Sequence, residues 1–592
     1  QQALVASVPS YPLSDSQRLD PLANAKVAAH LDYLFGQRVS PFANFDGLDG
    51  INLFLSSYGD HSLAVTGFDK EPKENSGKRA YGDALTNAYS LGVLSAVNTW
   101  VAAKDLTASV ALPNEQLNIL DLAGMAGGVS NELCENCDQE ARQKLLSSGA
   151  ALHARSTSTA VIPLTYGHIS PSLLIQGAAE LLMAGANNFV VNGLAHDSQI
   201  NGKGSSWQPY GAINLSDLNA DSYLNYQGYI QNYLGRAQQL AQLGKPQLDV
   251  LIYYPWQGWP LASEASAKWM YEQLPILRAI ESAGLRWAWV GDADLQAASL
   301  SPLGIKVHAA VVKSVLFLNS PFLAKKTASH LQSLDTGGAA FWRFGDVPNA
   351  MPSVEEGSSS AEQAEQALSR FFGGDLVAEL EGADELIAWA RSSVGGLSFR
   401  LEETAAGVQL MTRSFENGAV HFFYNRGNQG IELRFKAAGH AHRLNLATGE
   451  ALPIEPLREQ YRLRLAPGEL VPVLVQVFGV PLSDNVASAI EPVFQPIARL
   501  QPESSTATGS SARQYVMSMT KGEDSEFHRF RLQAEGLRGV LKVSVNGKQC
   551  ANLLLSPYLA EIESCLQAGE NKITAELIGQ DASVDVVWMS GF

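Results

Sequence analysis

The chain has 592 residues with a formal net charge of −17, and 46% of the residues are hydrophobic. This length predicts several domains with separate cores, and the acidic charge argues against nucleic acids and anionic membrane surfaces as partners, because both need a basic footprint. No apolar run in the sequence reaches the roughly 18 residues of a membrane-spanning helix.

The first part of the chain alternates helices and strands. After a polar lead we expect a helix, a strand with its loop, a second helix and a second strand, at residues 23–35, 42–55, 83–103 and 106–113. This alternation continues into the next 150 residues, so the same kind of fold is expected there.

Residues 159–256 are the most informative stretch, because three apolar strands separated by helices each end in a polar or aromatic cluster. The strands read TAVIPLTYG, ANNFVVNGLAH and LDVLIYYPW. This alternation favours a parallel sheet or a (β/α) barrel, whose active face lies at the carboxyl ends of the strands. Aromatic rings, amides and acids at one rim are typical of a sugar-binding cleft. The alternative is that these are ordinary strand ends capped by turn residues.

Residues 263–348 keep the strand–helix rhythm but are typical of a doubly wound, flavodoxin-like sheet. A helix over 268–285 precedes the predicted strands RWAWVGD and VHAAVVKSVLFLN, and the glycines of DTGGAAFW end a further helix before a strand. The segment has no GxGxxG or GxxxxGK[ST] motif, so no nucleotide site is predicted.

After about residue 397 the hydrophobic period changes to two, as in AVHFFYNRG and IELRFKA. This period predicts antiparallel strands, and a Ser/Thr/Pro-rich linker at residues 495–513 leads to a last all-β module. We therefore predict a multidomain fold, α/β followed by all-β, in four parts. They are a (β/α) barrel-like catalytic domain with about five strands (1–262), a flavodoxin-like α/β domain (263–395), an antiparallel β-sandwich (396–482) and a C-terminal jelly-roll-like β-sandwich (483–592).

The four cysteines form two local pairs, Cys134/Cys137 and Cys550/Cys565. We predict a disulfide in each pair and an exported protein, with free thiols as the alternative. The CxxC spacing of the first pair also suits a redox centre or half a zinc site, but no second CxxC or HxxxH completes one. The sequence begins at Gln1 rather than Met, which we interpret as a removed leader or a trimmed chain.

The order of these parts resembles the α-L-rhamnosidases of glycoside hydrolase family 106 and, more distantly, glycoside hydrolase family 42. The resemblance begins near Leu117 and is strongest in NEQLNILDLAG, AELLMAGANNFVVNG and YIQNYLGRAQQLAQLGKPQLDVLIYYP, the last including Arg236, Asp249 and Pro255. HLQSLDTGGAAFWRFGDVP is similar to the flavodoxin-like domain of both families. The terminal VNGK and AGEN motifs resemble the β-sandwich that closes many glycosidases.

The resemblance implies a secreted, periplasmic or cell-surface bacterial hydrolase that removes terminal α-L-rhamnose, or a similar deoxysugar, from polysaccharide with inversion. An inverting enzyme needs an acid and a base roughly 6.5–9.5 Å apart. Glu132, which follows a predicted strand, is the candidate acid, and Glu264, just beyond LIYYPWQGWP, is the candidate base. Either glutamate is, taken alone, more often a solvated loop residue.

Other residues are candidates for binding the substrate. Four aromatic side chains would stack on sugar rings: Trp207, Tyr210, Trp256 and Trp259. Six polar side chains would bind hydroxyl groups: Asp46, Asp49, His168, Asn192, His196 and Asp197. Core packing and turn capping are the alternative roles of these residues. The resemblance also implies a calcium ion near the sugar, although no DxDxDG loop is present.

A rival hypothesis is a glycan-binding or structural surface protein that has lost catalysis on the same scaffold. The strand VIPLTYG lacks the acidic residue that family 106 carries there, which favours this rival. The sequence has no GxSxG elbow and no HExxH motif, so a Ser–His–Asp hydrolase and a metal hydrolase of the HExxH type are not predicted.

Overall fold

The computed structural model contains two compact units, Gln1–Val161 with Leu181–Val190 and Ala241–Ala419, and Ile162–Glu180 with Val191–Leu240 and Val420–Phe592. In the described part of the chain, no helix is both long and apolar enough to cross a membrane. The structure describes residues 2–8, 48–55, 75–104, 107–111, 118–131, 138–155, 157–163, 171–192, 220–256, 264–334, 340–351, 359–393, 399–401, 405–456, 460–476, 494–499, 501–502, 513–521, 529–535, 540–553, 559–578 and 585–591.

The first unit begins with a six-stranded sheet whose spatial order follows the chain, β1-β2-β3-β4-β5-β6. The pairs from β1 to β5 are all parallel. Sequential parallel strands are typical of (β/α) barrels, although the described strands form an open series rather than a closed ring. The strands are β1 (Gln2–Val8), β2 (Leu48–Leu55), β3 (Thr107–Ala111), β4 (Gly128–Asn131), β5 (Thr157–Pro163) and β6 (Asn188–Asn192).

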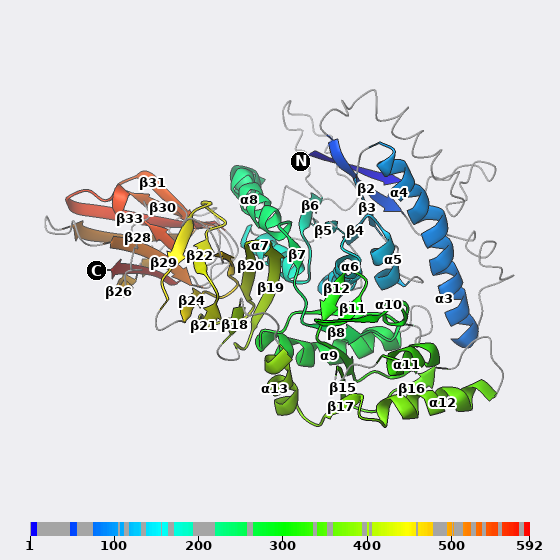
Figure 1. The fold of residues 1–592 in the computed structure, drawn as a ribbon. Coiled ribbons are helices and arrows are strands. Elements are labelled where there is room, and N and C mark those ends of the chain that lie inside the picture. The colour runs from blue at the N-terminus through cyan, green and yellow to red at the C-terminus, as the bar shows by residue number, and fades with distance from the viewer. Residues whose placement is uncertain are drawn as a thin grey trace. The chain divides into compact units, whose positions relative to one another are not determined.

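Helices of the first unit precede and follow these strands. Figure 1 shows α3 and α4 as one long helix beside β2 and β3, joined by a π-helical turn at Ser90–Leu94. The shorter α5 and α6 pack so closely that Gly149 of α6 leaves no room for a side chain against the carbonyl of Leu120. The helices are α3 (Asn75–Tyr89), α4 (Ser95–Ala102), α5 (Ile119–Met125) and α6 (Gln139–Leu152).

A second, five-stranded parallel sheet in the same unit has the order β17-β15-β13-β8-β9. Counted along the chain this is 2-1-3-4-5, the strand order of flavodoxin-like sheets. Its strands are β8 (Val250–Tyr253), β9 (Trp287–Val290), β13 (Ser314–Leu318), β15 (Phe341–Phe344) and β17 (Val377–Leu380). Its helices are α9 (Glu264–Ser282), α10 (Asp292–Gln296), α11 (Lys325–Gln332), α12 (Ser359–Phe372) and α13 (Ala383–Ser393). Short strands accompany it at β10 (Ser299–Ser301), β11 (Gly304–Val307), β12 (Ala310–Val312), β14 (Phe322–Ala324) and β16 (Asn349–Met351).

Both faces of this sheet are covered, which explains why its central strands are continuously apolar. Ile252 and Leu316 pack in one buried cluster with residues of α9 and α13. Their neighbours Leu251 and Phe317 point to the other face and pack with residues of α11 and α12. The prediction that LDVLIYYPW is the last strand of the barrel is wrong: β8 pairs with β9 and β13 and is therefore the first strand of the second sheet.

A buried ion pair joins β8 to β9 at their starts. Asp249 accepts hydrogen bonds from Nε and Nη2 of Arg286 at 2.7 and 2.6 Å, and from the Arg286 backbone N–H at 3.0 Å. The two side chains are only 1% and 3% exposed. Asp249, one of the residues that carried the family resemblance, therefore holds two strands of the sheet in register.

The chain enters and leaves the segment that contains the second sheet at one place. β7 (Lys245–Pro246), just before β8, pairs antiparallel with Arg413–Ser414 of β19 (Val408–Phe415). Arg413 also donates hydrogen bonds from Nε and Nη2 to the carbonyls of Leu243 and Gly244, at 3.1 and 2.9 Å. The segment between these two strands is thus closed at its base.

The second unit contains two helices and the first antiparallel β region. Two of its strands, Ile431–Ala437 and Tyr461–Leu465, alternate buried and more exposed residues, because one face is packed and the other is solvated. β22 pairs with β23 and β25, and β21 pairs with β24, all antiparallel as predicted. The elements are α7 (Pro171–Met183), α8 (Ala220–Ala241), β18 (Phe399–Leu401), β20 (Gly418–Asn425), β21 (Ile431–Ala437), β22 (His440–Leu444), β23 (Ala451–Ile454), β24 (Tyr461–Leu465) and β25 (Leu470–Gln476). By residue number α7, α8 and β20 each belong partly to the first unit, and β18 belongs to it wholly.

The last module consists of two antiparallel sheets, β26-β34-β29-β32 and β27-β28-β33-β30-β31. Both contribute to one buried core, as Leu532 and Val543 illustrate. The predicted disulfide between Cys550 and Cys565 is present and joins β31 to the turn after β32; Cys134 and Cys137 lie outside the described residues. The elements are β26 (Phe494–Arg499), β27 (Gln501–Pro502), β28 (Arg513–Lys521), β29 (Arg529–Glu535), β30 (Val540–Val545), β31 (Lys548–Leu553), β32 (Leu559–Glu561), η6 (Glu563–Cys565), β33 (Gly569–Ile578) and β34 (Asp585–Gly591).

Candidate functional site

Most residues of the predicted sugar site fall where the structure gives no side-chain position. Asp49 lies in β2, Asn192 ends β6 and Glu264 begins α9, but their side chains are not described. Eight further candidates lie outside the described residues: Asp46, Glu132, His168, His196, Asp197, Trp207, Tyr210 and Trp259. Their roles therefore stay predictions.

The aromatic cluster that follows β8 is described, and it belongs largely to the core. Tyr253 and Tyr254 are buried, and Trp256 is partly buried against the same core cluster as Tyr254. Tyr254 packs between Trp269 and Trp289, with ring centroids 5.9 and 5.6 Å away. The prediction that this cluster forms an open sugar-binding rim was wrong for the two tyrosines, because both side chains are buried in the core around the second sheet.

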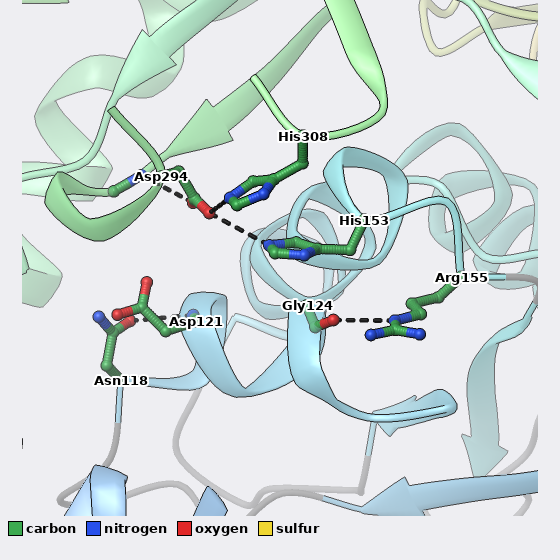
Figure 2. Close-up of polar contacts among 8 residues, drawn as sticks. Asn118, Asp121, Gly124, His153, Arg155, Asp294 and His308 are labelled. Carbon is green, nitrogen blue, oxygen red and sulfur yellow. Dashed lines mark hydrogen bonds and ion pairs between the residues drawn. The ribbon is translucent and has the colours of Figure 1, made fainter. Parts of the chain in front are cut away.

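A cluster of three polar side chains that no sequence motif predicted lies near the end of β9. The Oδ1 atom of Asp294, in α10, lies 3.2 Å from Nε2 of His153 and 3.0 Å from Nε2 of His308 (Figure 2). The two imidazole rings are stacked, with centroids 3.8 Å apart. We call these three residues the His–Asp–His cluster.

Three separate segments hold the His–Asp–His cluster in place. His153 caps the end of α6, and His308 lies in the turn between β11 and β12. The backbone N–H of Ala309 donates to the carbonyl of Leu152 at 2.9 Å, which brings the two histidines side by side. Gly124 of α5 makes room for the His153 ring, because a Cβ at that position would collide with it.

The carboxyl group of Asp294 is set by opposing effects. Burial disfavours its charged form, but the hydrogen bonds and charges of His153 and His308 outweigh burial and lower its pKa. Its Oδ2 accepts the backbone N–H of Gly291 at 3.4 Å, which caps the start of α10. Asp294 is therefore an ionised carboxylate with fixed orientation.

Asp121, at the start of α5, is a second carboxyl group beside the cluster. Its Oδ1 atom is buried and has no hydrogen-bond partner among the described residues. Burial raises its pKa well above the usual range, and the charges of Asp294, Asp292 and Asp83 add to the effect. Asp83 responds in the same way, with a pKa raised to about 6 by burial and by Asp292.

Asp292 is buried but well supplied with donors, so its role is structural. It accepts hydrogen bonds from the hydroxyls of Tyr253 at 2.7 Å and of Thr327 at 2.5 Å. Burial raises its pKa, and these bonds oppose the shift. Asp292 also accepts a hydrogen bond from the backbone of Ala324, which precedes α11, so it ties α10 to the start of α11.

A polar cleft elsewhere in the first unit is lined by Lys144, Glu281, Trp287 and Gln409. Burial lowers the pKa of Lys144 and raises that of Glu281, and each charge opposes the shift of the other. Trp287 Nε1 and Gln409 Nε2 donate to Glu281 at 2.9 and 3.2 Å. We interpret this group as a buried pair that ties α6 to α9.

In the described part of the chain, the His–Asp–His cluster is the one group of His, Cys, Asp or Glu side chains placed to share a metal ion. Its two imidazoles suit a transition metal, whereas calcium takes six to eight oxygen ligands. The cluster therefore does not fit the calcium ion that the family resemblance implied.

Comparison with solved structures shows a glycoside hydrolase-like fold. A rhamnosidase from Novosphingobium sp. PP1Y matches 97% of this chain with a TM-score of 0.67 and 14% identity, and this chain spans 64% of the length of that protein. A β-galactosidase from Bacillus circulans sp. alkalophilus matches 76% of this chain and 81% of its own length, with a TM-score of 0.52 and 11% identity. No protein-family model and no curated protein matches the sequence.

Proposed function

We propose that this protein is an exported glycoside hydrolase that removes terminal α-L-rhamnose, or a similar deoxysugar, from polysaccharide. The observation that carries the proposal is the likeness to a rhamnosidase over 97% of the chain, because it extends through the α/β sheets and the β-domains together. A common single module would not produce a match of that extent. The predicted domain boundaries at 395 and 482 and the assignment to family 106 belong to the same proposal, whereas the second sheet begins before the predicted boundary at 262.

The proposed acid is Glu132. β4 ends at Asn131, so Glu132 is the next residue after a parallel strand, where active-site residues of (β/α) folds lie. The buried Asn131 amide donates to the carbonyl of Gln139 at 2.9 Å, and Asp138 caps α6. These contacts fix both ends of the segment that carries Glu132.

The proposed base is Glu264, the first residue of the 19-residue helix α9. The helix N-terminus favours a negative charge within its first turn. Ionisation is what a general base needs and what a general acid must avoid, so this position supports the assignment of Glu264 as the base. In the reaction, Glu264 takes a proton from water, the water oxygen bonds to the anomeric carbon, and Glu132 protonates the leaving oxygen as the glycosidic bond breaks.

Export is supported by the disulfide between Cys550 and Cys565, because such bonds persist in oxidising compartments and are rare in the cytosol. Secretion, the periplasm and the cell surface all satisfy this condition. The partner in each case is a polysaccharide or oligosaccharide.

A non-catalytic glycan-binding or structural surface protein is the second candidate. It is favoured by β5, Thr157–Pro163, which carries no acidic residue, and by the burial of Tyr253 and Tyr254 in the core. Both features leave fewer groups for catalysis at the predicted rim.

The test is release of reducing sugar from p-nitrophenyl glycosides and rhamnose-containing polysaccharides. We expect hydrolysis by the wild type and a loss of about 10²–10⁴-fold in kcat for Glu132→Gln and for Glu264→Gln. Glu272→Gln, in the exposed part of α9, is the matched control and should retain activity. Full activity in the first two variants would refute their roles, and glycan binding without hydrolysis by the wild type would establish the second candidate.

A further inference from the structure

We propose that His153, His308 and Asp294 bind a divalent transition-metal ion of the zinc type, beside the buried carboxyl group of Asp121. The three potential ligand atoms of the His–Asp–His cluster all lie within 4.8 Å of one another. The proposed site contains neither Glu132 nor Glu264, so it stands independently of the proposed hydrolase activity.

The distances suit a four-coordinate ion. Around a tetrahedral zinc ion with bonds of about 2.0–2.1 Å, neighbouring ligand atoms lie about 3.3 Å apart. Nε2 of His153 and Nε2 of His308 are 3.2 and 3.0 Å from Oδ1 of Asp294. A small movement of the side chains would therefore admit an ion between the three atoms.

Two histidines that converge on one carboxylate oxygen are a better arrangement for a metal than for a hydrogen bond. A single hydrogen bond from one imidazole would already orient Asp294, and Gly291 bonds its other oxygen. With a metal present, both neutral imidazoles would offer lone pairs and Asp294 would offer charge, which are the ligand types that zinc prefers.

Asp121 provides an independent observation that points to a cation. Its Oδ1 is a buried carboxylate oxygen with no donor among the described residues, a state that costs free energy unless a partner is supplied. A Cβ placed on Gly291 would lie 3.1 Å from this atom and 3.9 Å from Oδ2 of Asp294, so the two oxygens are at most 7.0 Å apart. In Figure 2 Asp121 lies on the α5 side of the cluster, and the carboxylate of Asp294 points toward His153 and His308.

The ligand set and its exposure select the class of ion. Two imidazole nitrogens favour zinc, cobalt or nickel over magnesium and calcium, which prefer oxygen. The side chains of His153 and His308 are 22% and 29% exposed, so an ion has access from solvent. Since the ligands come from the end of α6, from α10 and from the β11–β12 turn, a bound ion would tie these three segments together.

The test titrates zinc into the full-length protein after dialysis against a chelator, with affinity measured by calorimetry. We expect one zinc ion per chain, with binding at least tenfold weaker in His153→Gln and in His308→Gln. His330→Gln is the matched control, because Nε2 of His330 hydrogen-bonds the carbonyl of Ala298 at 2.8 Å and is not part of the His–Asp–His cluster, so zinc affinity should be unchanged.

Cobalt substitution reports the coordination directly, even where a histidine variant folds poorly. We expect visible absorption typical of four-coordinate cobalt in the wild type, and a spectrum changed by the milder variant Asp294→Asn, with at least tenfold weaker zinc binding. No stoichiometric zinc binding by the wild type would overturn the proposal, as would zinc affinity that all three ligand variants retain. A cobalt spectrum unchanged in Asp294→Asn would likewise count against it.

Discussion

The buried ion pair between Asp249 and Arg286 should be among the most sensitive positions of the first unit. Asp249→Ala removes three hydrogen bonds and leaves the guanidinium of Arg286, whose side chain is 3% exposed, without its carboxylate. Breaking a buried pair in this way costs about 3–5 kcal/mol. At roughly 2–4 °C per kcal/mol for a unit of this size, the melting midpoint should fall by about 6–20 °C.

A double variant separates the ion pair from the space it fills. Asp249→Leu with Arg286→Met replaces both charges by apolar side chains, and such replacements of buried pairs are often neutral. We expect the double variant to have a higher melting midpoint than Asp249→Leu alone or Arg286→Met alone. The three variants together then give a large coupling energy in a double-mutant cycle.

The assay is thermal unfolding of the full chain by calorimetry, with circular dichroism to confirm the native fold. Glu272→Ala, which breaks the exposed pair with Lys268, is the control and should change the midpoint by no more than a few degrees. A loss below about 1 kcal/mol for Asp249→Ala, or single effects that simply add in the double variant, would refute the reasoning.

Three further predictions concern single features of the two units. The pKa of Asp83 is about 6 in the folded protein and 3.8 when unperturbed, so folding favours the protonated carboxyl group and stability falls as the pH rises from about 4 through 6. Asp83→Asn should therefore stabilise the protein at pH 8, by up to about 3 kcal/mol before solvent screening reduces the effect. It should bring no gain at pH 4, and paired urea titrations at the two pH values measure the difference. Gly124→Ala should lower the melting midpoint because the new methyl group displaces His153, whereas Gly177→Ala, with open space around it, should leave the midpoint unchanged or raise it; equal effects would contradict the packing argument. Replacing both cysteines of the β31–η6 disulfide with serine should cost the C-terminal module about 3 kcal/mol, as expected for a closed loop of 15 residues, and an unchanged calorimetric transition would count against that estimate.

The sequence predicted the elements of the fold better than their partners. The apolar runs RWAWV and SVLFL are strands, and the alternating run YRLRL is an antiparallel strand with one exposed face, because these patterns depend only on local burial. The strand VLIY was also predicted, yet it was assigned to the wrong sheet. A fully buried parallel strand is apolar on both faces, so its sequence says little about which strands lie beside it.

The candidate sites illustrate the same limit more sharply. Asp294 lies 141 positions from His153 in the chain, and no short motif links them. The turn between β11 and β12 and the hydrogen bond from the Ala309 N–H to the Leu152 carbonyl bring His308 to the same place. The aromatic pair Tyr253 and Tyr254 was misread for a related reason, since a ring that would suit a sugar also suits a core.

The antiparallel bridge between β7 and β19 determines how tension would pass through the chain. Pulling on the residues before Lys245 and after Ser414 loads this bridge first, so the flavodoxin-like sheet between them lies off the path of the force. The two strands are held at the end where the chain enters and leaves, which means that their hydrogen bonds would open one after another rather than all at once. The bridge and the hydrogen bonds from Arg413 to the carbonyls of Leu243 and Gly244 would therefore break before the sheet that they enclose is loaded.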